Sequence, residues 1–201
     1  GIVQLFCKMD LFYDAVDKRT DLDVREAYID LTLGEFDIRV GRQIVTWGFG
    51  DLVFINDVFP KNWVAFLSGQ PLQYLKVGSD AINVNIFPKF ASVQIIAIPF
   101  YQSDVLPRGE RILAFDPLPT IVNRREVQPE MTLKNTQIAG RMYRNLGNID
   151  VSLYFYRGFW GSPLGMILDS TQSQLTFTHP HLNVYGGSLQ GAFLNGVLSV
   201  E

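Results

Sequence analysis

The residues of this chain that could most directly do chemistry are two histidines, His179 and His181, which flank Pro180. On an extended strand, side chains two positions apart point to the same side, so both imidazoles could face one metal ion. A zinc site needs about three or four protein ligands, and the spacing brings no further ligand near this pair. We therefore expect a structural role for the two histidines, and we expect neither a metal nor a cofactor.

Signatures of covalent catalysis are missing from the sequence. There is no Gly-rich phosphate loop and no GxSxG motif. A Ser/His/acid site like that of membrane-embedded phospholipases has no supporting spacing. The lone cysteine, Cys7, lies between Leu5 and Met9 on an apolar strand face, which favours a structural role and excludes an intrachain disulfide. These observations predict a protein that is not an enzyme.

Charged side chains recur at alternate positions of segments that have the pattern of strands. Such residues could line a water-filled pore and bias which ions and solutes pass. Acidic groups outnumber basic ones among them, which predicts a mild preference for cations. The alternative is a mutually paired network that stiffens the wall and selects nothing. The candidate pore-lining residues are Lys8, Asp10, Asp14, Glu26, Asp30, Asp37, Arg39, Arg141 and Asp150.

The clearest element that would position these groups is a hairpin over residues 25–47. Apolar residues alternate with polar ones from Ala27 to Leu33, Gly34 and Glu35 form a turn, and the alternation resumes from Phe36. Alternation with a period of two on both sides of a two-residue turn is typical of a β-hairpin. Each arm can supply the roughly 9–11 residues that a tilted strand needs to cross a bilayer.

The remaining strands extend this pattern along the chain. We expect strands over residues 3–14, 74–87, 90–101, 136–144 and from 149 to about 157, then one ending near 189 and one from 195 to 201. Short turns follow the second, fourth, sixth and eighth strands, whereas long connections follow the third, fifth and seventh. Outer-membrane barrels have short periplasmic turns and longer extracellular loops. The alternation therefore predicts an antiparallel up-and-down transmembrane β-barrel whose first strand runs outward.

Composition limits the function classes further. Hydrophobic residues make up 47% of the 201 residues, but no run approaches the roughly 18 apolar residues of a membrane-spanning helix. The net charge of −3 and the lack of a basic stripe argue against nucleic-acid binding. About nine strands cannot close a bacterial barrel, which has an even number. We expect residues 1–201 to be one incomplete domain, the N-terminal part of a larger barrel, whose signal peptide has been removed.

A soluble β-sandwich has the same alternation of apolar and polar residues. Three features favour the barrel: long strands, alternating loop lengths, and aromatic residues near several strand ends. Those aromatic residues are Tyr13, Phe36, Phe155 and Phe159. A dry interior in which Leu5, Ile29, Leu31 and Val151 meet would indicate the sandwich.

The segment over residues 49–66 is too apolar for a solvated loop. We expect it to fold into the barrel and narrow the pore; the alternative is that it caps the rim. Its candidate lining residues are Asp51, Asn56, Asp57, Lys61, Asn62 and Trp63. Arg42 falls at an apolar position of the strand just before this segment, so we expect that strand to have left the hydrocarbon there, rather than a bulge at Gly41.

The stretch REAYIDLTLGEFDIRVGRQIVTWG, followed by INDVFPKNW, resembles a family of large proteobacterial outer-membrane barrels without an assigned function. That family is similar in pattern to the alginate-export and phosphate-selective porin groups. The resemblance implies a barrel in the outer membrane of a Gram-negative bacterium, in contact with membrane lipids.

Together, the pattern and the resemblance predict a porin-like channel for passive passage of small solutes. The alternatives are a structural barrel that sheathes or docks a partner protein, an exporter of an anionic polymer, and a soluble binding sandwich. Whether the protein forms a homo-oligomer or binds a periplasmic partner stays open.

Overall fold

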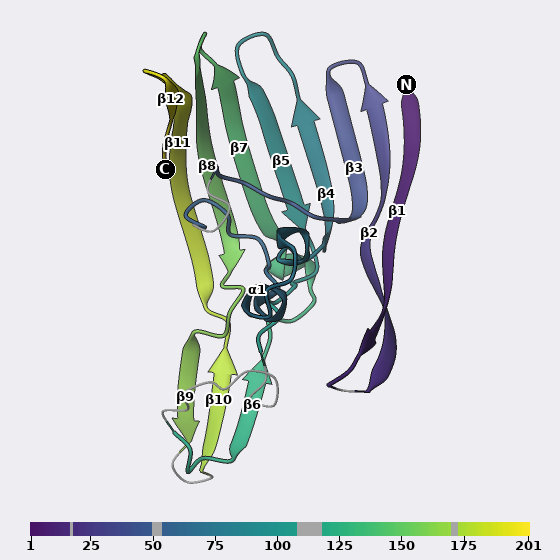
Figure 1. The fold of residues 1–201 in the computed structure, drawn as a ribbon, viewed down its shortest axis with the longest axis vertical. Coiled ribbons are helices and arrows are strands. Elements are labelled where there is room, and N and C mark those ends of the chain that lie inside the picture. Colours follow the sequence, from purple (N-terminus) through teal and green to yellow (C-terminus); the bar gives the residue numbers. More distant parts are fainter. Residues whose placement is uncertain (17, 50–53, 108–117, 170–172) are drawn as a thin grey trace.

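The computed structural model describes residues 1–16, 18–49, 54–107, 118–169 and 173–201, and within them the protein is all-β (Figure 1). Its strands are β1 (Ile2–Asp14), β2 (Arg19–Leu33), β3 (Phe36–Gln43), β4 (Ser79–Ile86), β5 (Ser92–Ile98), β6 (Asn123–Val127), β7 (Gln137–Asn145), β8 (Ile149–Phe159), β9 (Gly165–Asp169), β10 (Gln174–Thr178), β11 (His181–Phe193) and β12 (Gly196–Val200). Three short helices complete it: α1 (Trp63–Leu67), η1 (Leu72–Tyr74) and η2 (Leu133–Asn135). No helix in these ranges is long and apolar enough to span a membrane.

Nine strands form one antiparallel sheet in the order β1-β2-β3-β4-β5-β7-β8-β11-β12. The predicted hairpin is present as β2 and β3, with Gly34 at a φ of 62° in the turn, a value that suits glycine. The sheet is open: β1 and β12 are its two edges, and the sheet does not close into a barrel (Figure 1). Strands β3, β4 and β5 have 8, 8 and 7 residues, fewer than expected for a strand that crosses a bilayer.

A second, three-stranded sheet lies beyond one end of the large sheet (Figure 1). In it β10 pairs in parallel with β6 and antiparallel with β9. The sequence analysis did not predict β6 and β9, which lie within connections expected to be long, and the single strand expected to end near residue 189 is divided into β10 and β11. The described chain therefore has twelve strands rather than about nine.

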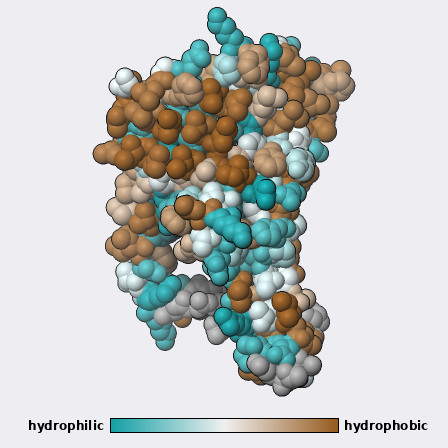
Figure 2. All heavy atoms as spheres, turned by 180° about the vertical axis from the view of Figure 1, so that it is seen from behind, coloured by the Kyte–Doolittle hydropathy of each residue, from teal (hydrophilic) through white to brown (hydrophobic). Residues whose placement is uncertain are grey.

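The large sheet has one apolar face and one polar face, as strand β8 illustrates. Leu153 on β8 is 54% exposed, whereas its neighbours Ser152 and Tyr154 are 2% and 5% exposed. Register continues this division from strand to strand, since the apolar row Val3–Leu31–Ile38–Val84–Ile95 crosses β1 to β5. We call the side that carries Leu153 the apolar face and the side that carries Tyr154 the polar face. Seen from the apolar side, hydrophobic residues form a broad belt over the large sheet (Figure 2).

The apolar face is uncovered in this structure. Leu5 is 80% exposed and Ile29 48% exposed, and neither lies in a dry interior. The buried core lies instead on the polar side, where Trp47 and Phe59 pack with Ile96, Tyr154 and Tyr156. A sheet that leaves its apolar face open and buries its polar face has the reverse of the arrangement in a soluble domain.

A bulge between β1 and β2 places Arg25 inside the molecule. Lys8 pairs with Glu26 and Met9 with Val24, so Arg25 is the extra residue. Its guanidinium is 6% exposed and donates to the carbonyl oxygens of Gln73 and Lys76. The pairing of β2 with β3, by contrast, continues through Gly41 to Arg42 without a shift, so the bulge lies in β2 and not at Gly41.

Candidate functional site

The candidate site is the polar face of the large sheet together with the segment that lies across it. One row of side chains on this face follows the register Asp37–Asn85–Gln94–Arg141–Tyr154 over five strands. A second row begins with Asp30, Arg39 and Asn83. These rows result from the period of two in each strand, because paired positions of neighbouring strands point to the same side.

Residues 44–49 and 54–59, which we call the crossing segment, follow the end of β3 and lie against this face between β3 and β11 (Figure 1). The indole N–H of Trp47 donates to Gln94 Oε1 at 2.9 Å. From there a chain of amide hydrogen bonds passes through Asn83 and Gln43 to the carbonyl oxygen of Ala81, with distances of 3.2, 3.1 and 3.0 Å. This series of hydrogen bonds gives the side-chain amides of Gln94, Asn83 and Gln43 a partner each, as polar groups away from water require.

The far end of the crossing segment contacts β11 through Asn56. Its side-chain amide donates to the carbonyl oxygen of Gly187 at 3.5 Å. A side chain at Gly186 would collide with Asn56 Oδ1, so glycine at this position permits the close approach. The described parts of the segment thus lie against the polar face.

Two charged residues that were candidate lining groups, Asp57 and Lys61, are each 5% exposed. Lys61 Nζ donates to the carbonyl oxygens of Asp57 and Phe59 at 2.7 and 2.9 Å, and Lys76 Nζ pairs with the Asp57 carboxylate. Burial lowers the pKa of Lys61, although the Asp57 carboxylate opposes this shift. The charges of Asp57 and Lys61 are therefore buried and bonded to neighbouring groups, so they stabilise the loop and do not line an open space.

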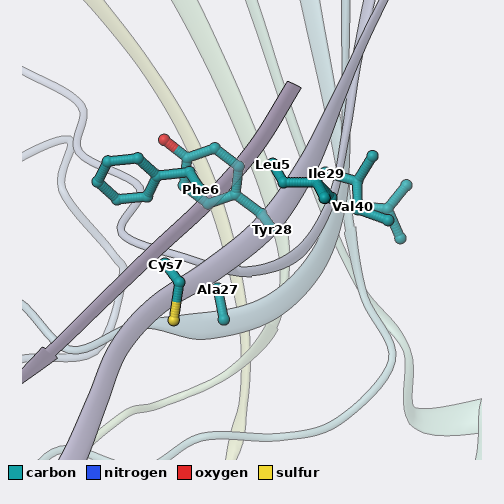
Figure 3. Close-up of a pocket in the computed structure, with 7 residues that line it drawn as sticks. All are labelled: Leu5, Phe6, Cys7, Ala27, Tyr28, Ile29 and Val40. Atoms are coloured by element: carbon teal, nitrogen blue, oxygen red, sulfur yellow. The ribbon is translucent and has the colours of Figure 1, made fainter. Parts of the chain in front are cut away.

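At the β1 edge, the polar face carries an aromatic and charged stack. Arg39 donates to both carboxylate oxygens of Asp30 at 2.7 and 2.9 Å, and its guanidinium lies 3.9 Å from the centre of the Tyr28 ring. Phe6 stacks on Tyr28 with ring centres 5.0 Å apart. Figure 3 shows the rings of Phe6 and Tyr28 on one side of the strands and Ile29 and Val40 on the other. Arg39 and Asp30 therefore form an ion pair.

Arg141, near the centre of the sheet, is arranged differently. Its guanidinium lies 4.6 Å from the centre of the Tyr143 ring and 5.5 Å from that of Tyr154. Nη2 donates to Ser152 Oγ at 3.1 Å, and Nε is buried without a hydrogen-bond partner. Within the described ranges, no carboxylate lies within ion-pair distance of Arg141.

The other candidate lining residues are distributed as follows. Glu26 accepts from the backbone N–H of Ile44 at 3.3 Å, Asp14 accepts from that of Val16 at 3.0 Å, and Asp10 lies 3.5 Å from Arg25. Asp150 accepts from the amide of Asn145 at 2.8 Å. Lys8 pairs in register with Glu26, and Asp37 with Asn85. Asp51 lies outside the described residues.

Trp63 begins the short helix α1 and Asn62 directly precedes it; the Trp63 ring lies 5.9 Å from that of Phe54 in the crossing segment. The Asn62 side chain caps the helix by accepting from the N–H of Ala65 at 3.0 Å. Trp63 Nε1 donates to Asp104 Oδ2 at 3.2 Å. Asp104 also accepts from the N–H of Lys61 and from Ser162 Oγ, at 2.9 and 2.6 Å. This carboxylate ties α1 to the β8–β9 connection, and no sequence signal pointed to it.

His179 also joins parts of the chain that are distant in sequence. Its Nδ1 lies 2.6 Å from the Tyr101 hydroxyl and 3.0 Å from the carbonyl oxygen of Trp160, and its Nε2 lies 3.1 Å from Glu126 Oε1. Burial, and secondarily the charge of Asp104, raise the pKa of Tyr101. His179 thus connects the end of the large sheet to β6 of the small sheet.

Among the residues that the structure describes, no group of three or more His, Cys, Asp or Glu side chains could hold a metal ion. Comparison of the chain with protein-family models, with curated proteins and with solved structures finds no match. The functional argument therefore rests on the two faces of the sheet and on the contacts described above.

Proposed function

We propose that the large sheet forms part of the wall of an outer-membrane channel for passive passage of small solutes, with the apolar face toward lipid and the polar face toward water. The observation that carries the proposal is the inverted polarity of the sheet. Its apolar residues, such as Leu5, Ile82 and Leu153, are 80%, 46% and 54% exposed, whereas the opposite face carries Asn, Gln, Arg and Tyr side chains. Outward apolar and inward polar residues are typical of a membrane barrel.

Pairing of the two open edges is part of this proposal. Unpaired backbone groups in hydrocarbon cost several kcal/mol each. We infer that β1 and β12 pair with further strands in the membrane, so that the wall closes.

The crossing segment would then act as a constriction. Its contacts with Gln94 and Gly187 place it across the polar face rather than beside it. This occupancy favours a narrowed channel over a barrel that sheathes another protein, because a sheath needs the polar face free. Export of an anionic polymer would call for many unpaired arginines there, but Arg39 is paired with Asp30.

Reconstitution into planar lipid bilayers tests the proposal. We expect stable step-like conductances from the purified protein, and a larger step size after deletion of residues 48–58. A protein that stays soluble without detergent and does not enter lipid would contradict the proposed lipid-facing sheet. Insertion into lipid without conductance would instead favour the sheath.

A further inference from the structure

We propose that Arg141 is a binding position for small oxyanions, that is carboxylates or phosphate, on the polar face of the large sheet. This inference rests on the proposed function, in which that face borders the water-filled passage. It names the class of solute that the passage would favour.

The first argument is the comparison of Arg141 with four other buried or half-buried cations, Arg25, Arg39, Lys61 and Lys76. Arg39 is neutralised by Asp30 through two hydrogen bonds. Lys61 and Lys76 share Asp57. Arg25 donates to two carbonyl oxygens and lies 3.5 Å from Asp10. Arg141 alone among these five has no carboxylate within ion-pair distance in the described parts of the chain.

The second argument is the geometry around the guanidinium. The guanidinium lies over the rings of Tyr143 and Tyr154, and because Nε is buried, the N–H groups of Nη1 and Nη2 are the ones that remain for an anion. Nη2 contacts the Ser152 hydroxyl, while Nη1 has no hydrogen-bond partner among the described residues. A guanidinium offers parallel N–H groups that match the two oxygens of a carboxylate or phosphate. Ser152 and the tyrosines would fix the orientation of the arginine before the anion arrives.

The third argument concerns the acidic residues that led us to expect a preference for cations. Asp30 is paired with Arg39, and Glu26, Asp14 and Asp150 accept hydrogen bonds from neighbouring N–H groups. Asp37 lies three strands from Arg141 in the same row, roughly 14 Å away at the usual strand spacing. At physiological salt, a charge at that distance is largely screened. Asp37 therefore contributes little to the electrostatic potential at Arg141, whose own charge is positive.

Binding of inorganic phosphate, followed by the width of its ³¹P NMR line, tests the proposal without requiring a channel. We expect the wild-type protein in detergent to broaden the line, and acetate to compete. Arg141→Gln should weaken binding about tenfold, the usual effect of losing a charge-assisted hydrogen bond. Arg141→Lys, which keeps the charge but not the paired N–H groups, should fall between the two.

Arg144→Gln is the matched control. Arg144 lies on the same strand as Arg141, but it is exposed and points to the apolar face, where it pairs with Val151. This variant should bind phosphate as the wild type does. Equal binding by wild-type and Arg141→Gln protein, or no binding by the wild type, would overturn the proposal.

Reversal potentials in a KCl gradient separate this inference from the proposed function. We expect Arg141→Gln to lower the chloride-to-potassium permeability ratio by about twofold or more, and Arg144→Gln to leave it unchanged. Conductance with the same ratio in both variants would reject the oxyanion position and keep the channel. Phosphate binding without conductance would keep the position and reject the channel.

Discussion

The indole N–H of Trp47 donates to the side-chain oxygen of Gln94 at 2.9 Å, and this contact joins the crossing segment to the centre of the large sheet. Trp47 is 3% exposed, and its ring lies 4.9 Å from that of Phe59 and 5.3 Å from that of Tyr154. The segment is thus held both by packing and by a hydrogen bond to a polar side chain of the large sheet.

Replacement of Trp47 by phenylalanine should lower the free energy of unfolding by about 1–3 kcal/mol. The substitution removes part of a buried ring and leaves the Gln94 oxygen without its donor. Urea unfolding in detergent, followed by circular dichroism, measures the change. Trp160→Phe is the control, because Trp160 is 41% exposed and its hydrogen bonds use only backbone groups. Equal stability of the two variants would contradict the anchoring role of Trp47.

Replacement of Gly186 by valine should push the crossing segment away from β11. The new side chain would meet Asn56, and overpacking of this kind costs about 1–3 kcal/mol. Limited proteolysis within residues 54–59 should become faster. Gly187→Val adds the same side chain one position along, where the nearest atoms are 3.5 Å away, so its proteolysis should match that of the wild type. Equal cleavage of both variants would show that the segment does not depend on this approach.

A lysine at Ile82 should reduce insertion into lipid vesicles. Ile82 is 46% exposed on the apolar face, and a cation near the bilayer midplane costs roughly 2–4 kcal/mol. Asn85→Lys places the same charge on the same strand but on the polar face, and should insert normally. The fraction of protein that floats with vesicles in a density gradient gives the comparison. In a soluble protein, the exposed Ile82→Lys would instead be nearly neutral.

Acid should weaken the contact between β6 and His179. Burial raises the pKa of Glu126, but hydrogen bonds from Gln128 and His179 outweigh it, and the net pKa lies below the ordinary 4.5. A carboxyl whose pKa is lowered on folding stabilises the fold above its unfolded pKa, and this stabilisation is lost as the pH falls through the folded value. We expect proteolysis of the small sheet to increase below about pH 4.5 in the wild type.

Glu126→Gln should remove most of that pH dependence, because an amide does not titrate in this range. The contacts of His179 with the Tyr101 hydroxyl and the carbonyl oxygen of Trp160 remain in this variant. An unchanged acid profile would mean that Glu126 does not hold the small sheet.

The large sheet could be predicted from the sequence because the alternation of apolar and polar residues that defines its strands lies within each strand. Alternation in β8, from Ile149 to Tyr156, assigns each side chain to a face without reference to any other strand. The small sheet could not be predicted in this way. Its strands β6, β9 and β10 have five residues each, and Asn123 pairs with Gln174, about fifty positions away. No periodicity encodes such a partner.

The candidate site was predicted in part for the same reason. Strand parity placed Arg39 and Arg141 on the polar side, but it could not tell that Asp30 neutralises one of them and that the other lacks a carboxylate. Counting charges therefore predicted a preference for cations, whereas the oxyanion position that we propose at Arg141 would favour anions. Asp57 and Lys61, four positions apart, could have suggested an ion pair, but their burial follows only from the tertiary fold.

The directions of the two edge strands limit how the proposed wall could close. Each of the eight neighbouring pairs from β1 to β12 is antiparallel, so these two strands run the same way. Two copies of the sheet joined edge to edge with their directions aligned would meet along parallel seams. A ring with antiparallel pairing throughout instead requires an odd number of additional strands between β12 and β1.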